Sequence, residues 1–335
     1  MHGSRGLSML PAVGHKTITM DNDKILLKKQ YYHLLDRVEK KSRTCMSPYC
    51  SKKAINSHVL QKSRYINRIA QNGHVYEHKV KRYGNREFEF SKVGINDVFT
   101  FKGFCAHHDN YIFKEIENDN VDLFDRKVNL LFAYRIICQE IVKKENKIIF
   151  YNELINNRLI DIEYYNWNIG GLKSGVRDCE YIKNKLHNNI NNAYLDEFGF
   201  YFREVSISDI CASGVYTYET SQEINNLSKF RTTFHLTEIF LNILPFKNKS
   251  FVSFVFFKDN NIECNAYLKS IFELSDDEFV KYLSDVLLVQ MENWIISSDL
   301  YNKIKDKESI LNDITIEALT SDNERFSPRF NLFKV

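Results

Sequence analysis

Hydrophobic residues recur every three to four positions in several long stretches of the chain, which is the spacing of one face of an α-helix. In 24–41 this spacing leaves the lysines on the opposite face, so the segment is predicted to be a basic amphipathic helix. Gly73 is suited to ending a second helix, and Ser275 to capping the start of a later one. The predicted helices cover 24–41, 63–71, 104–117, 124–144, 171–195, 275–294 and 298–313.

Strand patterns occur in two parts of the chain. Polar and apolar residues alternate in 74–90, and Gly84-Asn85 suits a tight turn, so this segment is predicted to be a β-hairpin. Later segments rich in β-branched and aromatic residues predict strands at 198–208, 210–218, 233–244 and 250–258. Together the patterns predict an α+β fold: a small module, then a helical segment, then a mixed domain with an antiparallel sheet.

Composition fits a globular protein, with 44% hydrophobic residues and only 4 prolines and 12 glycines. No run of 18 apolar residues occurs, so no membrane span and no membrane partner are expected. We interpret 1–19 as a leader segment, 20–150 as one domain and 151–335 as a second, acidic α+β domain. Seven cysteines, an odd number in a long chain, do not suggest a disulfide framework, which favours a cytoplasmic protein.

Positive charge is concentrated in the first domain. Residues 24–102 contain 18 lysine and arginine residues against 6 acidic ones, whereas the whole chain has a net charge of +3. The rest of the chain is therefore net acidic. A basic module of this kind favours a polyanionic partner such as nucleic acid, and the alternative is a lysine-rich helix that only faces solvent.

Four residues have the spacing of a tetrahedral zinc site. Cys45-x4-Cys50 and Cys105-x2-His108 each bring two ligands to one turn, and a closed shell of four protein ligands stabilises a fold rather than acting on a substrate. His107 competes with His108 for the fourth position, although the x2 spacing favours His108. The alternative is that the cysteines are incidental thiols and the two histidines a surface pair.

The residues between and after these pairs extend the pattern to C-x4-C, N-S-H-V-L and C-x2-H-D-N. From Cys45 to Asn110 this order resembles the zinc-stapled HNH nucleases, also called the ββα-metal family. The resemblance covers about residues 45–117 and implies a small zinc-bound treble-clef module. It also implies hydrolysis of nucleic-acid phosphodiesters with a divalent metal ion.

The resemblance assigns His58 as the general base and Asp109 as a ligand for a catalytic Mg²⁺ or Mn²⁺ ion. Ser57 departs from the family pattern, because that position normally supplies the second metal ligand. Three residues are candidate substitutes for it: Asn56, His107 and Glu117. Two simpler interpretations stay open: His58 as a buried histidine with one hydrogen bond, and Asp109 as a carboxylate favoured at a helix N-terminus.

Five basic residues around the His58 segment are predicted to contact phosphates without reading sequence: Lys52, Lys53, Lys62, Arg64 and Arg68. The resemblance favours DNA over RNA as the partner. No nucleotide-binding or nucleophile motif occurs in 151–335, and this half resembles the sensing or partner-binding domains of bacterial defence and effector proteins, including phage defence. A protein partner or a homo-oligomer through this half is therefore expected.

Two functions follow from these observations. The first is an HNH-like endonuclease with His58 and Asp109 in its active site. The alternative is a non-catalytic zinc module that binds nucleic acid or a protein partner through the same basic residues.

Overall fold

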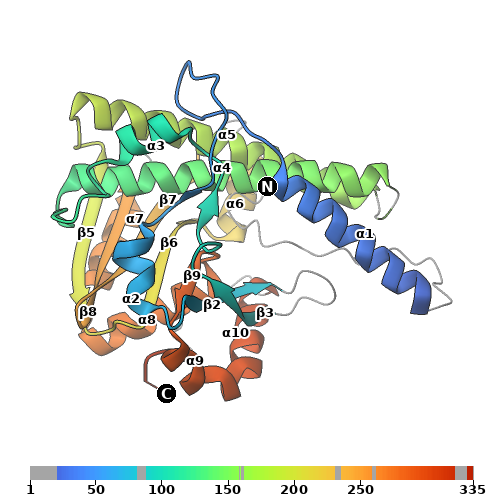
Figure 1. Ribbon diagram of the computed structural model, residues 1–335. Coiled ribbons are helices and arrows are strands. Elements are labelled where there is room, and N and C mark those ends of the chain that lie inside the picture. Colours follow the sequence, from blue (N-terminus) through green and yellow to red (C-terminus); the bar gives the residue numbers. More distant parts are fainter. Residues whose placement is uncertain are drawn as a thin grey trace.

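One antiparallel sheet organises the described part of the chain. Seven described strands lie in the order β3-β2-β9-β6-β7-β8-β5, and each neighbouring pair is antiparallel (Figure 1). The strands are β2 His74–Val80, β3 Phe88–Gly94, β5 Phe198–Val205, β6 Ile210–Thr217, β7 Glu238–Phe246, β8 Lys249–Phe257 and β9 Trp294–Ile296. The fold is therefore α+β with an antiparallel sheet, as the hydrophobic pattern predicts.

The computed structural model of the protein describes residues 21–80, 88–157, 159, 162–230, 235–258, 262–320 and 330–334. The predicted leader 1–19 and the predicted Gly84-Asn85 turn lie outside these residues.

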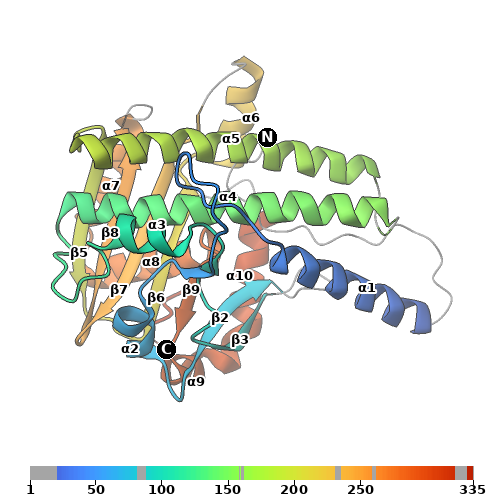
Figure 2. The same cartoon turned by 45° about the horizontal axis from the view of Figure 1, so that its top comes forward.

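Helices cover both faces of the sheet. Residues of α4 share one hydrophobic core with Phe240 and Leu244 of β7, while residues of α8 share another with Ile239 and Leu241 of the same strand. Side chains of a strand alternate between its faces, so α4 and α8 lie on opposite sides of the sheet. The long helices α4 and α5 lie side by side, and α1 packs against the end of α4 away from β5 (Figure 1 and Figure 2).

The described helices are α1 Asp21–Lys40, α2 Asn67–Ile69, α3 Ala106–Phe113, α4 Arg126–Asn156, α5 Ile162–Asn192, α6 Ser221–Phe230, α7 Ile262–Phe272, α8 Asp276–Val289, α9 Ser298–Ile304 and α10 Glu308–Thr320. A π-helical turn, Lys62–Ile66, precedes α2, and a 3-10 turn, Lys305–Lys307, precedes α10. In the part of the chain that the structure describes, no helix is both long and apolar enough to cross a bilayer.

The division expected near residue 150 falls inside α4 and does not separate two cores. Hairpin β2–β3 joins the sheet through β9, where Tyr76 pairs with Ile296. The core under α4 contains residues from Cys45 to Ile295. The basic N-terminal segment and the C-terminal half therefore share one sheet and one core, because pairing between strands far apart in sequence leaves no local signal.

Trp294 lies in a strand rather than at the end of a helix. The helix predicted for 275–294 ends at Val289, and Trp294–Ile296 forms β9, which pairs with β2 on one side and β6 on the other. All three residues of β9 are buried. Burial between two strands outweighs the helical pattern of the preceding sequence.

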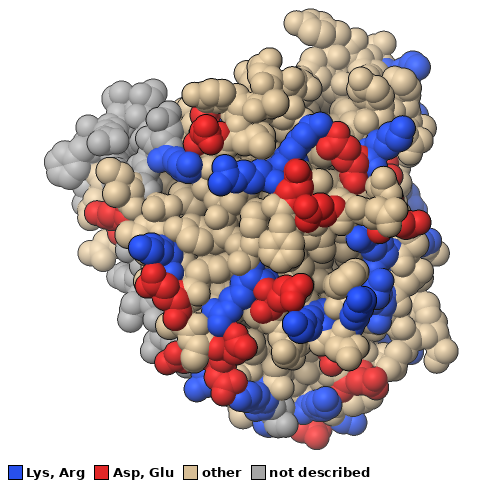
Figure 3. All heavy atoms as spheres, turned by 90° about the vertical axis from the view of Figure 1, so that its left-hand side faces the viewer, with Lys and Arg blue, Asp and Glu red and all other residues tan. Residues whose placement is uncertain are grey.

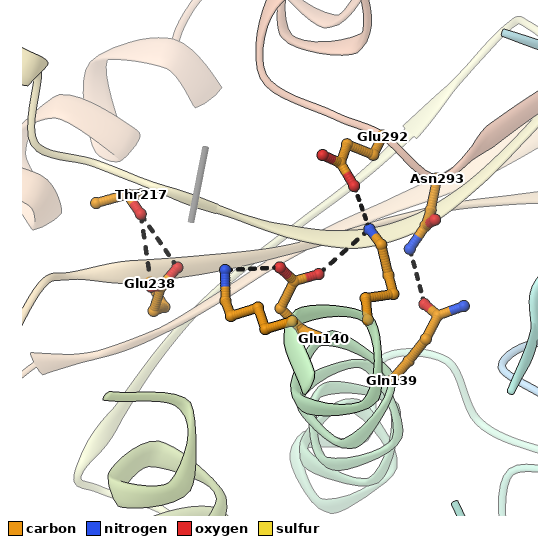
Figure 4. A network of polar contacts seen from close by, with 8 residues as sticks. Gln139, Glu140, Thr217, Glu238, Glu292 and Asn293 are labelled. Carbon is orange, nitrogen blue, oxygen red and sulfur yellow. Dashed lines mark hydrogen bonds and ion pairs between the residues drawn. The ribbon is translucent and has the colours of Figure 1, made fainter. Parts of the chain in front are cut away.

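A buried polar network joins α4 to the strands (Figure 4). The Glu140 carboxylate forms ion pairs with Lys144 at 2.8 Å and with Lys143 at 3.3 Å. Lys143 also forms an ion pair with Glu292. Beside this pair, the Asn293 amide donates to Gln139 at 2.7 Å. Removing one charged side chain would leave its ion-pair partner without a counter-charge. The network therefore holds α4 against the chain that leads into β9.

Glu238 of β7 lies near this network and is almost fully buried. Burial raises the pKa of its carboxyl to about 8. Its nearest described donor is the Thr217 hydroxyl, at 3.4 Å. The folded protein therefore favours the neutral acid.

We expect Glu238→Gln to flatten the dependence of stability on pH. The raised pKa means that Glu238 contributes stability that is fully present below the pKa of the unfolded chain and is lost as pH rises through about 8. The free energy of unfolding in urea, measured at about pH 5 and about pH 8, should fall less in the variant than in the wild type. Glu204→Gln, at an exposed ion pair with Lys249, should keep the wild-type slope. Equal slopes in all three proteins would contradict the assignment.

Candidate functional site

The four predicted metal ligands lie together in the structure. One ligand atom from each of Cys45, Cys50, Cys105 and His108 lies within 4.8 Å of the others. Cys45 and Cys50 come from the segment that follows α1, Cys105 is the N-cap of α3, and His108 lies in its first turn. These four residues could hold a metal ion.

Three of the separations between ligand atoms are close to those expected around a single central ion. The Sγ atoms of Cys50 and Cys105 are 3.9 Å apart, and His108 Nδ1 is 3.5 Å from Cys45 Sγ and 3.4 Å from Cys105 Sγ. A tetrahedral ion with bonds of about 2.3 Å to sulfur and about 2.0 Å to nitrogen separates two sulfur ligands by about 3.8 Å and a sulfur from a nitrogen by about 3.5 Å. These three separations are therefore close to those around a tetrahedral ion.

Local backbone contacts hold both halves of this cluster. Cys45 N donates to Lys52 O at 2.9 Å, and Met46 N donates to Gly103 O at 2.8 Å. Gly103 lies next to the ring of Phe101, where a Cβ atom would come within 2.2 Å of the ring. Only glycine permits this close approach, so the residue is part of the fold that brings the two pairs together.

The protonation states of Cys105 and His108 also favour metal binding. The backbone N–H of His108 stabilises the Cys105 thiolate and lowers the pKa of that thiol. Burial, His107 and Lys52 lower the pKa of the His108 imidazole, which favours its neutral form. Thiolate and neutral imidazole are the forms that bind metal. His107, the competing fourth ligand, is exposed and stacks instead on Tyr111, with ring centroids 6.0 Å apart.

His58 lies on a short antiparallel pair of strands. Strand β1, Ser57–His58, pairs with β4, Thr100–Phe101. His58 Nε2 lies 3.3 Å from the carbonyl oxygen of Ile95. Because a carbonyl only accepts hydrogen bonds, Nε2 carries the proton and Nδ1 of the neutral ring is the basic nitrogen.

The surroundings of His58 favour the neutral ring. Burial is the main cause that lowers the pKa of its imidazole, and the positive charges of Lys62 and Arg135 act in the same direction. The Ile95 carbonyl and the Asp109 carboxylate act against them. His58 is therefore half-buried, neutral near pH 7 and within electrostatic reach of Asp109.

Asp109 pairs with a buried arginine that the sequence patterns did not reveal. Arg135 of α4 donates to Asp109 at 3.2 Å and to Glu117 at 2.7 Å, and its side chain is only 1% exposed. Its guanidinium also lies 4.0 Å from the centre of the Phe113 ring. The available signal was a single arginine within an otherwise apolar run of a predicted helix.

Of the predicted substitutes for a second catalytic-metal ligand, the structure brings Glu117 near Asp109, because both carboxylates bind Nη2 of Arg135. Glu117 lies beyond the end of α3, which is shorter than predicted, and it binds Arg135. Asn56 is exposed, and Ser57 is buried with no hydrogen-bond partner for its hydroxyl among the described residues. Across the described ranges, the Cys45 cluster is the one group of three or more metal-ligating side chains.

Of the five predicted phosphate-binding residues, three are exposed: Lys52, Lys53 and Arg68. The other two, Lys62 and Arg64, are half-buried. Lys62 donates to Asn96 at 2.7 Å, Arg64 donates to the carbonyl of Asn118, and Arg68 lies over the ring of Phe246. No described carboxylate forms an ion pair with any of the five: Lys52, Lys53, Lys62, Arg64 and Arg68. Their charge is thus not neutralised within the described chain.

Comparisons with protein families, with curated proteins and with solved structures found no match. The chemistry of the site therefore rests on its own residues.

We expect Cys50→Ser to abolish metal binding and to lower stability. A serine hydroxyl is a poor metal ligand, and a structural ion bound far above its dissociation constant adds about 4 kcal/mol to the free energy of unfolding. Metal content per chain and urea unfolding measure both effects. Cys138→Ser is the matched control, because Cys138 is fully buried in α4 outside the cluster, so this variant should lose stability but keep its metal. Full metal occupancy in Cys50→Ser would contradict the assigned site.

We expect substitutions of the two charges near His58 to move its pKa in opposite directions. Arg135→Met removes a positive charge and should raise the pKa, whereas Asp109→Asn removes a negative charge and should lower it. NMR titration of the His58 ring, identified by its absence in His58→Gln, measures both shifts. Arg135→Met should also cost about 3 kcal/mol of stability, because it leaves two carboxylates without their cation. Shifts in the same direction would show that these charges do not act on His58.

Proposed function

We propose that Cys45, Cys50, Cys105 and His108 bind one structural zinc ion in a treble-clef module. Support comes from the ligand types, three thiols and one imidazole, and from separations close to those around tetrahedral zinc. Four protein ligands leave no open position, so the ion stabilises the fold. The module would consist of the Cys45–Cys50 turn, the β1–β4 pair and α3.

We infer that the site beside this module hydrolyses nucleic-acid phosphodiesters in the manner of the HNH nucleases. One observation carries this inference: the hydrogen bond between His58 Nε2 and the Ile95 carbonyl fixes the tautomer in which Nδ1 is basic. A neutral imidazole with a free Nδ1 can take a proton from an attacking water. Among the described residues no hydrogen-bond partner occupies Nδ1.

Asp109 would hold the Mg²⁺ or Mn²⁺ ion, which would neutralise charge on the scissile phosphate. Arg135 already binds one oxygen of this carboxylate, at 3.2 Å, and lies closer to Glu117. The same arginine orients Asp109 toward α4. DNA remains the preferred substrate over RNA on the strength of the family resemblance, and the five unpaired basic residues would contact its phosphates.

The Arg135–Asp109 pair favours a second candidate function. A buried guanidinium beside Asp109 competes electrostatically with a divalent cation at the same carboxylate. On this reading the zinc module binds nucleic acid through its basic residues without cutting it. The two candidates share the metal site and differ in the role of His58.

The first test is cleavage of supercoiled plasmid and of single-stranded RNA by the purified protein with Mg²⁺ or Mn²⁺. His58→Ala should lower the cleavage rate at least about 100-fold, the size of a general-base contribution, while bound zinc stays near one per chain. His33→Ala, an exposed histidine of α1, should cleave like the wild type. Binding without cleavage by the wild type with either metal would favour the second candidate.

A further inference from the structure

A fully exposed tyrosine lies at the tip of the turn between two metal ligands. Tyr49 is 108% exposed, and its backbone has a φ of 61°. The turn is closed by Cys50 N donating to Ser47 O at 3.2 Å. Glycine or asparagine is favoured at such a position, and a bulky aromatic residue there is both strained and solvated. Neither the fold nor the metal cluster explains why the ring is displayed.

The outward face of α3 displays a second aromatic surface next to the same cluster. Tyr111 is 74% exposed, and its ring is nearly parallel to that of His107, with an angle of 10° between their planes. His107 directly precedes the ligand His108. Lys114, one turn further on, is also exposed on this face, since residues three, four and seven apart share one side of a helix.

Two exposed lysines, Lys52 and Lys114, lie in the same segments as these rings. Lys52 is exposed, and its backbone carbonyl accepts a hydrogen bond from the N–H of the ligand Cys45 at 2.9 Å. Neither Lys52 nor Lys114 forms an ion pair within the described ranges. By contrast, the side of the molecule where β5 lies shows both signs of charge interspersed (Figure 3), with pairs such as Lys249 and Glu204. The surface beside the metal cluster is therefore basic and aromatic, whereas the β5 side is mixed.

We propose that this knuckle surface, formed by Tyr49, Lys52, His107, Tyr111 and Lys114, binds a single-stranded segment of nucleic acid by stacking on unpaired bases. Exposed aromatic rings interleaved with cations are the arrangement that binds single strands, because every base offers a flat face and every nucleotide a phosphate. Paired bases inside a duplex do not offer their faces to such rings. The inference deepens the proposed function and rests on its nucleic-acid partner, though not on cleavage.

The knuckle surface lies on the side of α3 opposite to Asp109. Positions 107 and 111 are each two residues from Asp109, which places them about 200° around the helix from it. Asp109 faces Arg135 and the core, whereas the rings face solvent. A nucleic-acid strand bound to the knuckle surface would therefore contact residues other than His58 and Asp109. Mutations can then test the knuckle surface separately from the site of His58 and Asp109.

The test is fluorescence anisotropy of the full chain with three labelled probes of about 20 nucleotides: oligo(dT), oligo(rU) and a DNA duplex. No divalent ion is added, so the measurement reports binding alone. Tyr49→Ala and Tyr111→Ala should each weaken single-strand binding at least about fivefold, because stacking of one base contributes about 1–3 kcal/mol. Duplex affinity should change less than about twofold. Tyr49→Phe and Tyr111→Phe, which keep the ring, should bind like the wild type.

Tyr194→Ala is the matched control, because Tyr194 is 60% exposed just beyond α5, away from the cluster. Lys52→Ala should weaken all three probes and reduce the salt dependence of binding, since it removes a phosphate contact. Unchanged metal content in every variant shows that the knuckle is intact. Single-strand binding that is absent, or that survives both tyrosine-to-alanine changes, would overturn the proposal. Cleavage that depends on His58 would be unaffected by that outcome.

Discussion

Three thiol sulfurs and an imidazole nitrogen lie within 4.8 Å of one another at the start of α3. Thiolate and neutral imidazole groups gathered this closely are the ligand types of a tetrahedral metal site, so the cluster could hold one metal ion. The cluster joins Cys45 and Cys50 to Cys105 and His108 across 54 intervening residues. Closing that loop brings β1 against β4 and sets α3 beside them. The positions of His58 and Asp109 both depend on it.

Helix α4, packed on strands of the C-terminal half, supplies the second support for the site. Arg135 extends from α4 to Asp109 and Glu117, and α4 in turn packs on the sheet through a core that includes Cys211 and Ile295. The half-buried ion pair between Lys143 of α4 and Glu292 holds the helix against the chain that enters β9. A change in the C-terminal half can therefore reach Asp109 through one rigid helix. The acidic half of the chain is part of the scaffold of the basic site.

Sequence patterns predicted those features that a local signal encodes. Ligand spacing predicted the metal cluster, and hydrophobic periodicity predicted α1, α4 and the four later strands. Three features had no such signal. Strand β9 is only three residues long and forms because it pairs with β2 on one side and β6 on the other. Strand β2 joins the sheet by pairing with β9, which lies more than 200 residues later in the chain. Arg135 acquires its role from a carboxylate 26 positions away, which periodicity does not detect.

The central claim is that one zinc ion with three sulfur ligands and one nitrogen ligand organises the N-terminal module. X-ray absorption at the zinc edge of the purified full-length protein tests it directly, because the fine structure gives the number and type of ligands. We expect one zinc per chain with three sulfur neighbours at about 2.3 Å and one nitrogen neighbour at about 2.0 Å. A metal-free protein with four unligated side chains and unchanged stability, or a shell made mainly of oxygen, would contradict it.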